Sequence, residues 1–383
     1  MILALVLFAV WAYLGGTVVA VLRFARRRVV PPPAQPPVSV LKPLYGTEPG
    51  LYENLLSFVD QDYPAVQVVF GVRSSDDEAL PIVRRVIAER PDRDTALVID
   101  SRVSGRNLKV ANLVNMLPAA RHDILVFADA DMRVGCGYLA AVTAPLCDPA
   151  IGLVTCLYKG LPSPAIPAGC PWSWLWSRLG ALHINYGFLP SALLADALGT
   201  GDGCFGATIA LRRGVLEKIG GLAVVRDELA DDHRIGTAVR DAGFAAALSP
   251  YIVETSVSEP SFKSLWQHEL RWARTVRLMA PMGFAGSIVT HAVAIAALAM
   301  LFSGLSLTSL GFLAMSCALR WVSAGVMARV LRLPTTGMWL LPLRDLLSFA
   351  VFVGSFCGRN VSWRDQLFRI EPSGRIIVDG DGS

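Results

Sequence analysis

Two short runs of acidic residues stand directly after apolar segments of strand length, where they could bind a cation. Asp76 and Asp77 follow the segment 66–72, while Asp129 and Asp131 follow another apolar run. Two carboxylates one residue apart concentrate negative charge, which suits a hard divalent cation, Mg²⁺ or Mn²⁺, completed by substrate phosphate oxygens and water. The alternative is a solvated turn, because Asp is common in turns and at helix N-caps. We expect the cation at Asp129 and Asp131, and both interpretations stay open for Asp76 and Asp77.

A third acidic pair, Asp231 and Asp232, stands where a helix is expected to begin. Carboxylates also stabilise the N-terminal end of a helix dipole, so a capped helix is the alternative to a functional site. The fourth signal is the pentapeptide His268-Glu-Leu-Arg271-Trp272, on an amphipathic stretch that leads into an apolar region. Taken alone, this stretch is typical of a basic juxtamembrane helix with an interfacial Trp.

The segment 38–282 is expected to fold as an α/β domain that positions these residues. Short apolar runs alternate with helical patterns, with strands expected at 38–41, 66–72, 96–99, 124–128 and 151–156, and helices at 52–60, 78–90, 107–120 and 138–146. Strands alternating with helices of this length predict a mostly parallel sheet covered on both faces. Ligands of such sheets bind beyond the carboxyl ends of the strands, so we expect the acidic residues to converge on one edge.

The composition of the 383-residue chain argues against a soluble protein. It is 53% hydrophobic and 17% charged, whereas soluble proteins are roughly 45–50% apolar and about 25% charged. Disorder is excluded because so much apolar surface does not stay solvated. The net charge of +4 is too small and too dispersed to indicate a nucleic-acid partner. The seven cysteines form no C-x-x-C pair, which argues against a disulfide scaffold or thiolate zinc site and favours a reduced compartment.

Two apolar regions predict membrane attachment. Residues 1–22 are uncharged and long enough to cross a bilayer as a helix. The linker 23–37 brings four arginines after this run, whereas a secretory signal has its positive charge before it, so we expect an uncleaved anchor. Basic residues flanking a span prefer the cytoplasmic side, which places the domain 38–282 in the cytoplasm. The region 283–358 contains further membrane segments, and the basic residues of 359–383 favour a cytoplasmic tail.

The number of C-terminal spans is left open by the sequence. The stretches 283–307 and 309–328 predict two spans. A third stretch, 338–357, contains Arg344 and Asp345. Charges at membrane depth are costly and usually face protein or an interface, so this third stretch is expected to re-enter or to lie flat.

Taken together, the strand-end acid, the D-x-D pair, the later Asp-Asp and the Arg-Trp before membrane segments resemble the signature of membrane-bound, family-2-like glycosyltransferases with a Rossmann-like GT-A fold. The resemblance covers most of the chain and is closest to the ceramide glucosyltransferase branch, through VLKPLYG (40–46), NLLSF (54–58) with DYP (62–64), KVANL (109–113), and CFGAT (204–208) with GGL (220–222). Within this branch the chain is most similar to bacterial hopanoid-associated glycosyltransferases, through YENL (52–55), NMLPAARHD (115–123) and HELRWART (268–275). Two departures stand out: His268 replaces the family's Gln or Arg, and Asp231 replaces a frequent Glu.

The resemblance implies transfer of a single sugar from a UDP-sugar to a lipid hydroxyl at a bacterial inner membrane. UDP-N-acetylglucosamine and a hopanoid, bacteriohopanetetrol, are the expected pair, and UDP-glucose with ceramide is the alternative. A processive polysaccharide synthase shares these signals, but about three C-terminal segments make a poor tunnel for a polymer. A membrane transporter or lipid-binding subunit would leave the cytoplasmic acids without a purpose. The metal, the sugar, the acceptor and the oligomeric state are not identified by the sequence.

The resemblance also implies roles for residues on the donor side. Asp131, with Asp129 nearby, would hold the divalent cation and so offset charge on the leaving diphosphate. Lys109 and Arg271 would add fixed positive charge near the phosphates. A phosphate contact is also expected at His268, which can donate a hydrogen bond.

Three more residues complete the expected site. Asp77 would hold the uridine, Trp272 belongs to the Arg-Trp motif, and Asp232 is the expected general base that takes the acceptor proton. With one base and no covalent nucleophile in view, we expect a single displacement with inversion at the anomeric carbon.

The acceptor side is expected in the aromatic segment 171–198. A soluble protein would bury this segment as core, whereas a lipid transferase would use it as an interfacial surface. His183 lies in it and is either a structural histidine or, by resemblance to ceramide glucosyltransferases, a site residue. Gly203 and Gly206 are expected to flank a strand on the same side and to permit close packing.

Overall fold

The computed structural model describes residues 2–29, 35–163, 172–200, 203–358, 360–363, 366–370 and 376–377. Most of the proline-rich spacer and the last residues of the expected tail lie outside this set. The chain forms two compact units. One, called here the sheet unit, comprises Arg27–Lys159 and Asp202–Ser256, and the other, the helical unit, comprises Met1–Arg26, Gly160–Gly201 and Val257–Ser383.

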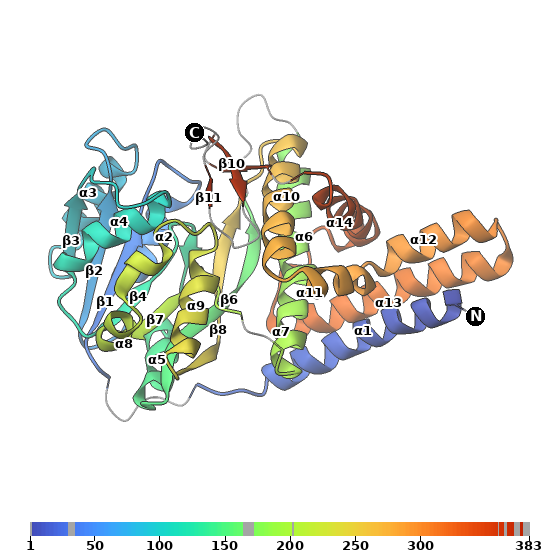
Figure 1. Ribbon diagram of the computed structural model, residues 1–383, viewed down its shortest axis with the longest axis horizontal. Coiled ribbons are helices and arrows are strands. Elements are labelled where there is room, and N and C mark those ends of the chain that lie inside the picture. Colours follow the sequence, from blue (N-terminus) through green and yellow to red (C-terminus); the bar gives the residue numbers. More distant parts are fainter. Residues whose placement is uncertain are drawn as a thin grey trace. The chain divides into compact units, whose positions relative to one another are not determined.

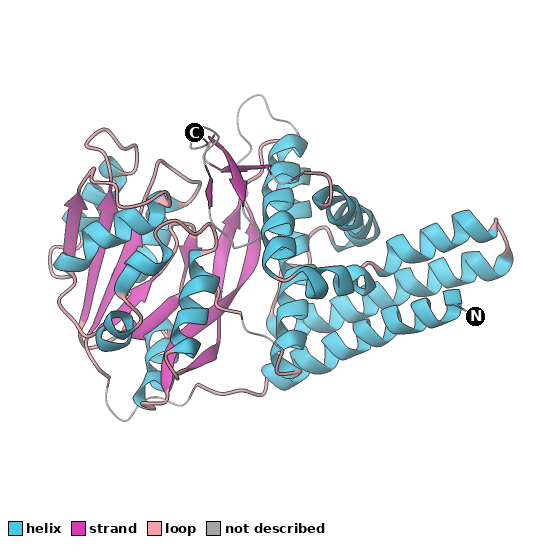
Figure 2. Ribbon diagram, viewed as in Figure 1, coloured by secondary structure: helices cyan, strands magenta, loops and turns pink. Residues whose placement is uncertain are grey.

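The sheet unit is built on a mixed, mostly parallel sheet (Figures 1 and 2). Its strands, among the described residues, are β1 (Val38–Pro43), β2 (Val66–Val72), β3 (Asp94–Ile99), β4 (Ile124–Phe127), β5 (Met132–Arg133), β6 (Ile151–Pro162), β7 (Ile209–Arg212) and β8 (Ala245–Val257). They lie in the order β3-β2-β1-β4-β7-β6-β8-β5. The neighbours β3, β2, β1 and β4 run parallel, while β7 is antiparallel to β4 and β6, and β5 to β8. This architecture confirms the predicted α/β fold class.

Helices cover both faces of the sheet (Figure 1). They are α2 (Leu51–Val59), α3 (Leu80–Glu89), α4 (Leu108–Met116), α5 (Tyr138–Thr143), α8 (Arg213–Lys218) and α9 (Asp231–Asp241), with short 3₁₀ turns η1 (Leu117–Ala119), η2 (Ala144–Cys147) and η4 (Gly221–Val225). Side chains from α2, α3 and α5 form one buried cluster, and those from α4, α8 and α9 form another. Alternate residues of each strand feed the two clusters, because successive side chains of a strand point to opposite faces.

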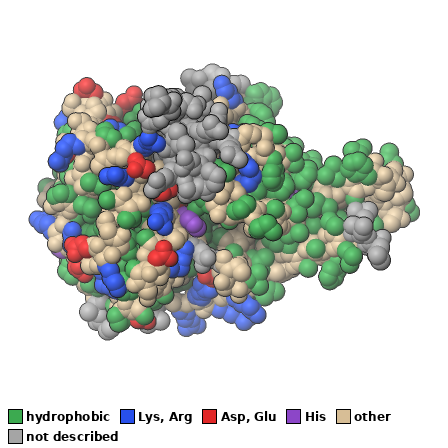
Figure 3. All heavy atoms as spheres, viewed as in Figure 1, with side chains coloured by type: hydrophobic (Ala, Val, Ile, Leu, Met, Phe, Trp, Pro, Cys, Tyr) green, Lys and Arg blue, Asp and Glu red, His purple; other side chains and the backbone are tan. Residues whose placement is uncertain are grey.

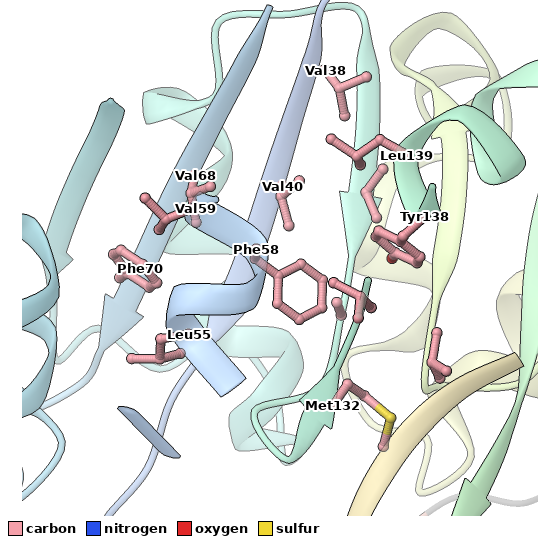
Figure 4. Packing of buried hydrophobic residues seen from close by; sticks show 14 of the residues in the cluster. Val38, Val40, Leu55, Phe58, Val59, Val68, Phe70, Met132, Tyr138 and Leu139 are labelled. Atoms are coloured by element: carbon pink, nitrogen blue, oxygen red, sulfur yellow. The ribbon is translucent and has the colours of Figure 1, made fainter. Parts of the chain in front are cut away.

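Strands β1 and β2 illustrate this alternation. Val40 and Phe70 belong to the first cluster and Leu41 to the second. Figure 4 shows Phe58 of α2 close to Val40, with Leu55 near Phe70. On the opposite face α4 approaches β2 at Gly71, where an added Cβ would lie 2.3 Å from Met116 Sδ. A side chain at this position would therefore push α4, which carries Lys109, away from the sheet.

The predicted strands and helices of the sheet unit are found at the expected places, with one correction. The strand expected between Gly203 and Gly206 begins only at Ile209. The preceding residues form a turn because their backbone groups bind side chains: Phe205 N donates to Thr155 Oγ1 at 2.9 Å, and Gly206 N donates to an Asp carboxylate described below. These groups are therefore not available for a sheet ladder.

The helical unit contains the apolar helices. Its described elements are α1 (Ile2–Phe24), α6 (Ser173–His183), the π-helical turn η3 (Ile184–Phe188), α7 (Leu189–Ala197), α10 (Phe262–Met279), α11 (Pro281–Gly286), η5 (Ser287–Thr290), α12 (Ala292–Ser303), α13 (Leu307–Leu331), η6 (Met338–Leu340), α14 (Leu341–Ser355), β9 (Asn360–Trp363), β10 (Gln366–Ile370) and β11 (Ile376–Ile377). The three strands form a small antiparallel sheet. Helices α6, η3 and α7 follow one another without a break, and Asn185 in η3 bonds both backbone groups of Gly160 at 2.8 Å.

Among the described residues, three helices have the length and composition of a membrane span: Leu5–Phe24, Leu307–Leu331 and Met338–Ser355. A fourth span is possible by these criteria if Pro281–Thr290 and Ala292–Ser303, which are bent by 72°, count as one. The span expected at 283–307 falls on this bent pair, in which the 3₁₀ turn Ser287–Thr290 lies between α11 and α12. Figure 3 shows hydrophobic side chains covering the visible face of α12 and α13, as expected of lipid-facing helices.

The charges in these segments are paired within the helical unit. Arg320 of α13 binds Asp345 of α14 with Nε 3.0 Å from each carboxylate oxygen. Arg344 of α14 forms a two-pronged pair with Glu269 of α10, at 2.7 Å for both contacts. All four side chains are at most 6% exposed. Because paired charges cost less in a low-dielectric environment than single ones, Met338–Ser355 is compatible with a span as well as with the expected re-entrant segment.

Candidate active site

Four charged side chains of the sheet unit meet around Gly206, and this group is called the Lys109 cluster. Lys109 lies in the first turn of α4. Asn107 caps this helix, because its side chain accepts hydrogen bonds from the N–H groups of Lys109 and Val110. The Lys109 ammonium is 2.7 Å from Asp129 Oδ1 and 3.3 Å from Asp231 Oδ2. Burial disfavours its charged form, but the two carboxylates outweigh burial and hold the pKa of Lys109 above its usual value.

Asp232 is the fourth member of the Lys109 cluster. Its Oδ2 accepts from Gly206 N at 2.8 Å and its Oδ1 from His233 N at 2.7 Å. A Cβ added to Gly206 would lie 3.3 Å from Asp232 Oδ2, 3.4 Å from Asp129 Oδ2 and 3.5 Å from Lys109 Nζ. Burial, followed by the charge of Asp231, raises the pKa of Asp232 to about 6, while Lys109 opposes the rise. A carboxylate with this pKa is a stronger base than an ordinary aspartate.

Asp131 lies next to the Lys109 cluster, and its carboxylate is held by β8. Its Oδ2 accepts from Thr255 Oγ1 at 2.6 Å. Burial, followed by the charge of Asp129, raises the pKa of Asp131. Beneath them the fully buried Lys42 donates to the backbone carbonyl of Asp129. Burial lowers the pKa of Lys42 to about 7, although the negative charges of Asp131 and Asp129 act to raise it.

The donor set at Asp129 and Asp131 fits a divalent cation that shares its coordination with substrate. The charge of Asp129 raises the pKa of Asp131, and a cation between the two side chains would offset this repulsion. Within the described part of the chain, no three His, Cys, Asp or Glu side chains gather as a complete metal site. Mg²⁺ and Mn²⁺ accept fewer protein ligands, because phosphate oxygens and water fill the remaining positions.

Asp77 lies in the turn after β2, where its carboxylate ties two strand ends together. Its Oδ1 accepts from Gly46 N at 3.0 Å and from Ala79 N at 2.9 Å, so the loops after β1 and β2 are joined. Through these bonds Asp77 has a structural role. Its side chain is half-buried, and the second carboxylate oxygen can still accept a hydrogen bond from another donor. Neither of these hydrogen bonds reaches the Lys109 cluster.

The other predicted site residues belong to the helical unit. His268, Arg271 and Trp272 lie on α10, where the rings of His268 and Trp272 are 4.3 Å apart between centroids at 64°. His183 is the last residue of α6 and is half-buried. Burial lowers the pKa of His183 to about 4 despite the opposing charge of Glu269, so its ring is neutral near pH 7. A neutral imidazole can donate or accept a hydrogen bond but adds no fixed positive charge.

Sequence reasoning missed several residues that support these sites. Lys42 and Thr255 hold Asp129 and Asp131 from positions far along the chain, so no local pattern indicates them. Asn107 also binds Glu228 O at 2.8 Å and thereby ties α4 to the segment before α9. Its place directly before a helical pattern, as an Asn N-cap, was the available signal.

A mixed, mostly parallel α/β sheet with a D-x-D pair after β4 is typical of a GT-A glycosyltransferase. The model of Glycosyl transferase family 21 matches residues 3–376, and the chain belongs to this family. It is therefore a glycosyltransferase enzyme with membrane-type helices.

Individual relatives are distant. Ceramide glucosyltransferase 1 of Caenorhabditis elegans is 25% identical over 256 residues, which cover 66% of this chain and 53% of that protein, about half its length. Ceramide glucosyltransferase 3 of the same organism is 22% identical over 352 residues, covering 89% and 74%. Among solved structures, a mannosyltransferase from Pyrobaculum calidifontis in complex with GDP-Man and Mn²⁺ is similar in fold, with a TM-score of 0.52, 21% identity, and coverage of 93% and 98%.

Proposed function

We propose that the enzyme transfers a single hexose from a UDP-sugar to a hydroxyl group of a membrane lipid, with inversion at the anomeric carbon. The observation that carries this proposal is the convergence of Lys109, Asp129 and Asp232 on Gly206, beside the D-x-D carboxylate Asp131. Cation-binding carboxylates, a fixed ammonium and a basic carboxylate are the groups required to release a diphosphate and to deprotonate an alcohol.

The relatives favour UDP-glucose and ceramide as donor and acceptor. Both named Caenorhabditis elegans proteins are ceramide glucosyltransferases, so they support this pair better than UDP-N-acetylglucosamine and a hopanoid. The hopanoid pair is a second candidate, carried by the segments 52–55, 115–123 and 268–275 that are typical of hopanoid-associated enzymes. Both acceptors are amphiphiles with a hydroxylated head, which suits an enzyme with membrane-type helices.

Asp129 and Asp131 would hold Mg²⁺ or Mn²⁺ together with the donor diphosphate. The cation supplies charge that offsets the negative charge growing on the leaving UDP. Lys42 and Thr255 keep this pair of carboxylates in place from below and from β8. Lys109 adds a permanent positive charge to the same region, because its ammonium stays protonated between two carboxylates. The half-buried Asp77 would bind the uridine end of the donor.

Asp232 is the proposed general base. It takes the proton of the acceptor hydroxyl while the hydroxyl oxygen forms a bond to the anomeric carbon. The bond from that carbon to the UDP oxygen breaks, and its electron pair leaves with the diphosphate. A pKa of about 6 leaves Asp232 ionised at neutral pH and makes it more basic than a solvent-exposed aspartate.

The predicted residues of α10 and α6 have roles of their own in this proposal. We propose that Arg271 and His268 contact the donor diphosphate, since arginine and histidine N–H groups suit phosphate oxygens. Trp272 holds the His268 ring on α10. His183, neutral and half-buried at the end of α6, would bond the hydroxylated head of the acceptor. The arginines after α1 favour a cytoplasmic position for the chain that follows, at the inner membrane of a bacterium.

A donor-by-acceptor matrix tests the function. Purified enzyme with Mn²⁺ is mixed with UDP-glucose or UDP-N-acetylglucosamine and with ceramide or bacteriohopanetetrol, and products are identified by mass spectrometry. Glucosylceramide would support the favoured pair, and an N-acetylglucosaminyl hopanoid the second candidate. Long polymeric products would indicate a processive synthase instead. If no lipid product forms and no UDP is released with any pair, the proposed lipid transfer is wrong.

A further inference from the structure

Glu259 has a buried carboxylate whose two oxygens both have partners. It lies between β8 and α10, and its side chain is 8% exposed. Its backbone N–H donates to Ser177 Oγ at 3.0 Å, which ties it to α6. Its Oε2 accepts from Ser264 Oγ, and its Oε1 lies 2.8 Å from His268 Nδ1. Two contacts to the carboxylate and one to the backbone make Glu259 a rigid support for the histidine ring.

The start of α10 builds this support from local sequence. Ser261 caps the helix and accepts from Ser264 N at 3.1 Å. Ser264 and His268 are four residues apart and therefore share one helix face, with Trp272 four residues further. The anionic Glu259 precedes the helix N-terminus, where the helix dipole favours negative charge. Glu259 and Trp272 thus hold the His268 ring from two sides.

This contact decides which nitrogen of His268 can meet a substrate. An ionised carboxylate only accepts hydrogen bonds, so Nδ1 carries a hydrogen and donates it to Glu259. Nε2 is then the ring nitrogen left for substrate, and the side chain is 40% exposed. A ring that bonds both the Glu259 carboxylate and a diphosphate donates one N–H to each of them.

We propose that Glu259 is a positioning residue that orients His268 as an N–H donor to the diphosphate of the sugar nucleotide. The inference rests on the proposed function and deepens it. A glutamine or an arginine at this place would present an N–H group to phosphate without a partner. A histidine ring needs one, because it must be turned so that one nitrogen faces the phosphate. Glu259 fixes this orientation in this chain.

The test is a double-mutant cycle on nucleotide binding. UDP with Mn²⁺ is titrated calorimetrically into the full-length protein, in detergent and without a lipid acceptor, for wild type, Glu259→Gln, His268→Ala and the double variant. We expect Glu259→Gln to weaken UDP binding about tenfold, because a hydrogen bond to a charged group is stronger than one to a neutral group by roughly that factor. His268→Ala should weaken it by a similar factor, and the double variant should bind no more weakly than His268→Ala alone.

Two results would overturn the inference: unchanged UDP affinity in Glu259→Gln, or effects of the two substitutions that multiply in the double variant. Ser264→Ala, which removes the second partner of the carboxylate, covers the case in which Glu259→Gln does not fold. Ser264→Ala should weaken UDP binding two- to threefold in wild type and not at all in the His268→Ala background. Equal weakening in both backgrounds would also overturn the inference. A wild type that does not bind UDP would instead contradict the proposed function, and one that binds UDP but glycosylates no tested lipid would contradict only the acceptor.

Discussion

The buried pair between Arg344 and Glu269 is expected to hold α10 and α14 together. Arg344→Met removes both 2.7 Å contacts to Glu269 and the two bonds to Ser348 Oγ. It leaves the Glu269 carboxylate, 4% exposed, without its counter-ion. Breaking a buried ion pair in this way costs about 3–5 kcal/mol of unfolding free energy. Replacing both partners by methionine is expected to recover most of that cost, because an apolar pair of similar volume needs no desolvation.

Tryptophan fluorescence during denaturant unfolding in detergent measures this effect, since all nine tryptophans belong to the helical unit. Lys263→Met is the matched control, because Lys263 is an exposed cation on the same helix α10. The control should change the unfolding free energy by no more than about 0.5 kcal/mol. If Arg344→Met behaves like the control, or if the double variant is as unstable as the single one, the pair does not hold the helices as argued.

Three further predictions concern the chemistry. Asp232→Asn should lower turnover at least about 100-fold, as expected for loss of a general base, while calorimetry shows unchanged UDP binding; near-wild-type turnover would exclude Asp232 as the base. In wild type, kcat/KM should fall as the pH drops below 6, because Asp232 with a pKa of about 6 must be ionised to accept the proton; a profile that is flat down to pH 5 would contradict this assignment. Removal of divalent cations with EDTA should abolish transfer and Mn²⁺ should restore it, with more Mn²⁺ required by Asp131→Asn; full activity in EDTA would refute the cation site.

The main elements of the sheet unit were predictable because local pattern and global fold agree there. The apolar runs that form β2 and β4 have the length of a strand. The acidic residues that follow each run closely were therefore expected near a strand end. The pair Asp231 and Asp232 opens α9, where an acidic helix start was expected. In this region the side-chain period, the turn residues and the helix caps all indicate the same structure.

Contacts between distant positions were not predictable in the same way. Thr255 bonds Asp131 across 124 residues, and Lys42 reaches the Asp129 carbonyl across 87. Neither contact follows from periodicity or local propensity, since only the order of strands in the sheet brings these residues together. The same limit applies to the 72° bend after Pro281–Thr290. Hydropathy is averaged over a window of residues, so it does not show where the axis of an apolar helix changes direction.

The π-helical turn Ile184–Phe188 changes how the aromatic segment around it must be interpreted. It inserts one additional residue into an otherwise continuous helix, which advances the chain by about 100° around the axis. A helical wheel drawn straight through 173–197 would therefore misplace every position of α7 by about 100° around the axis. The observed phase is the one that brings Ser191 Oγ within 2.6 Å of Tyr13 Oη on α1. Substitutions in α6 and in α7 should consequently be assigned to helix faces with a separate helical wheel for each helix.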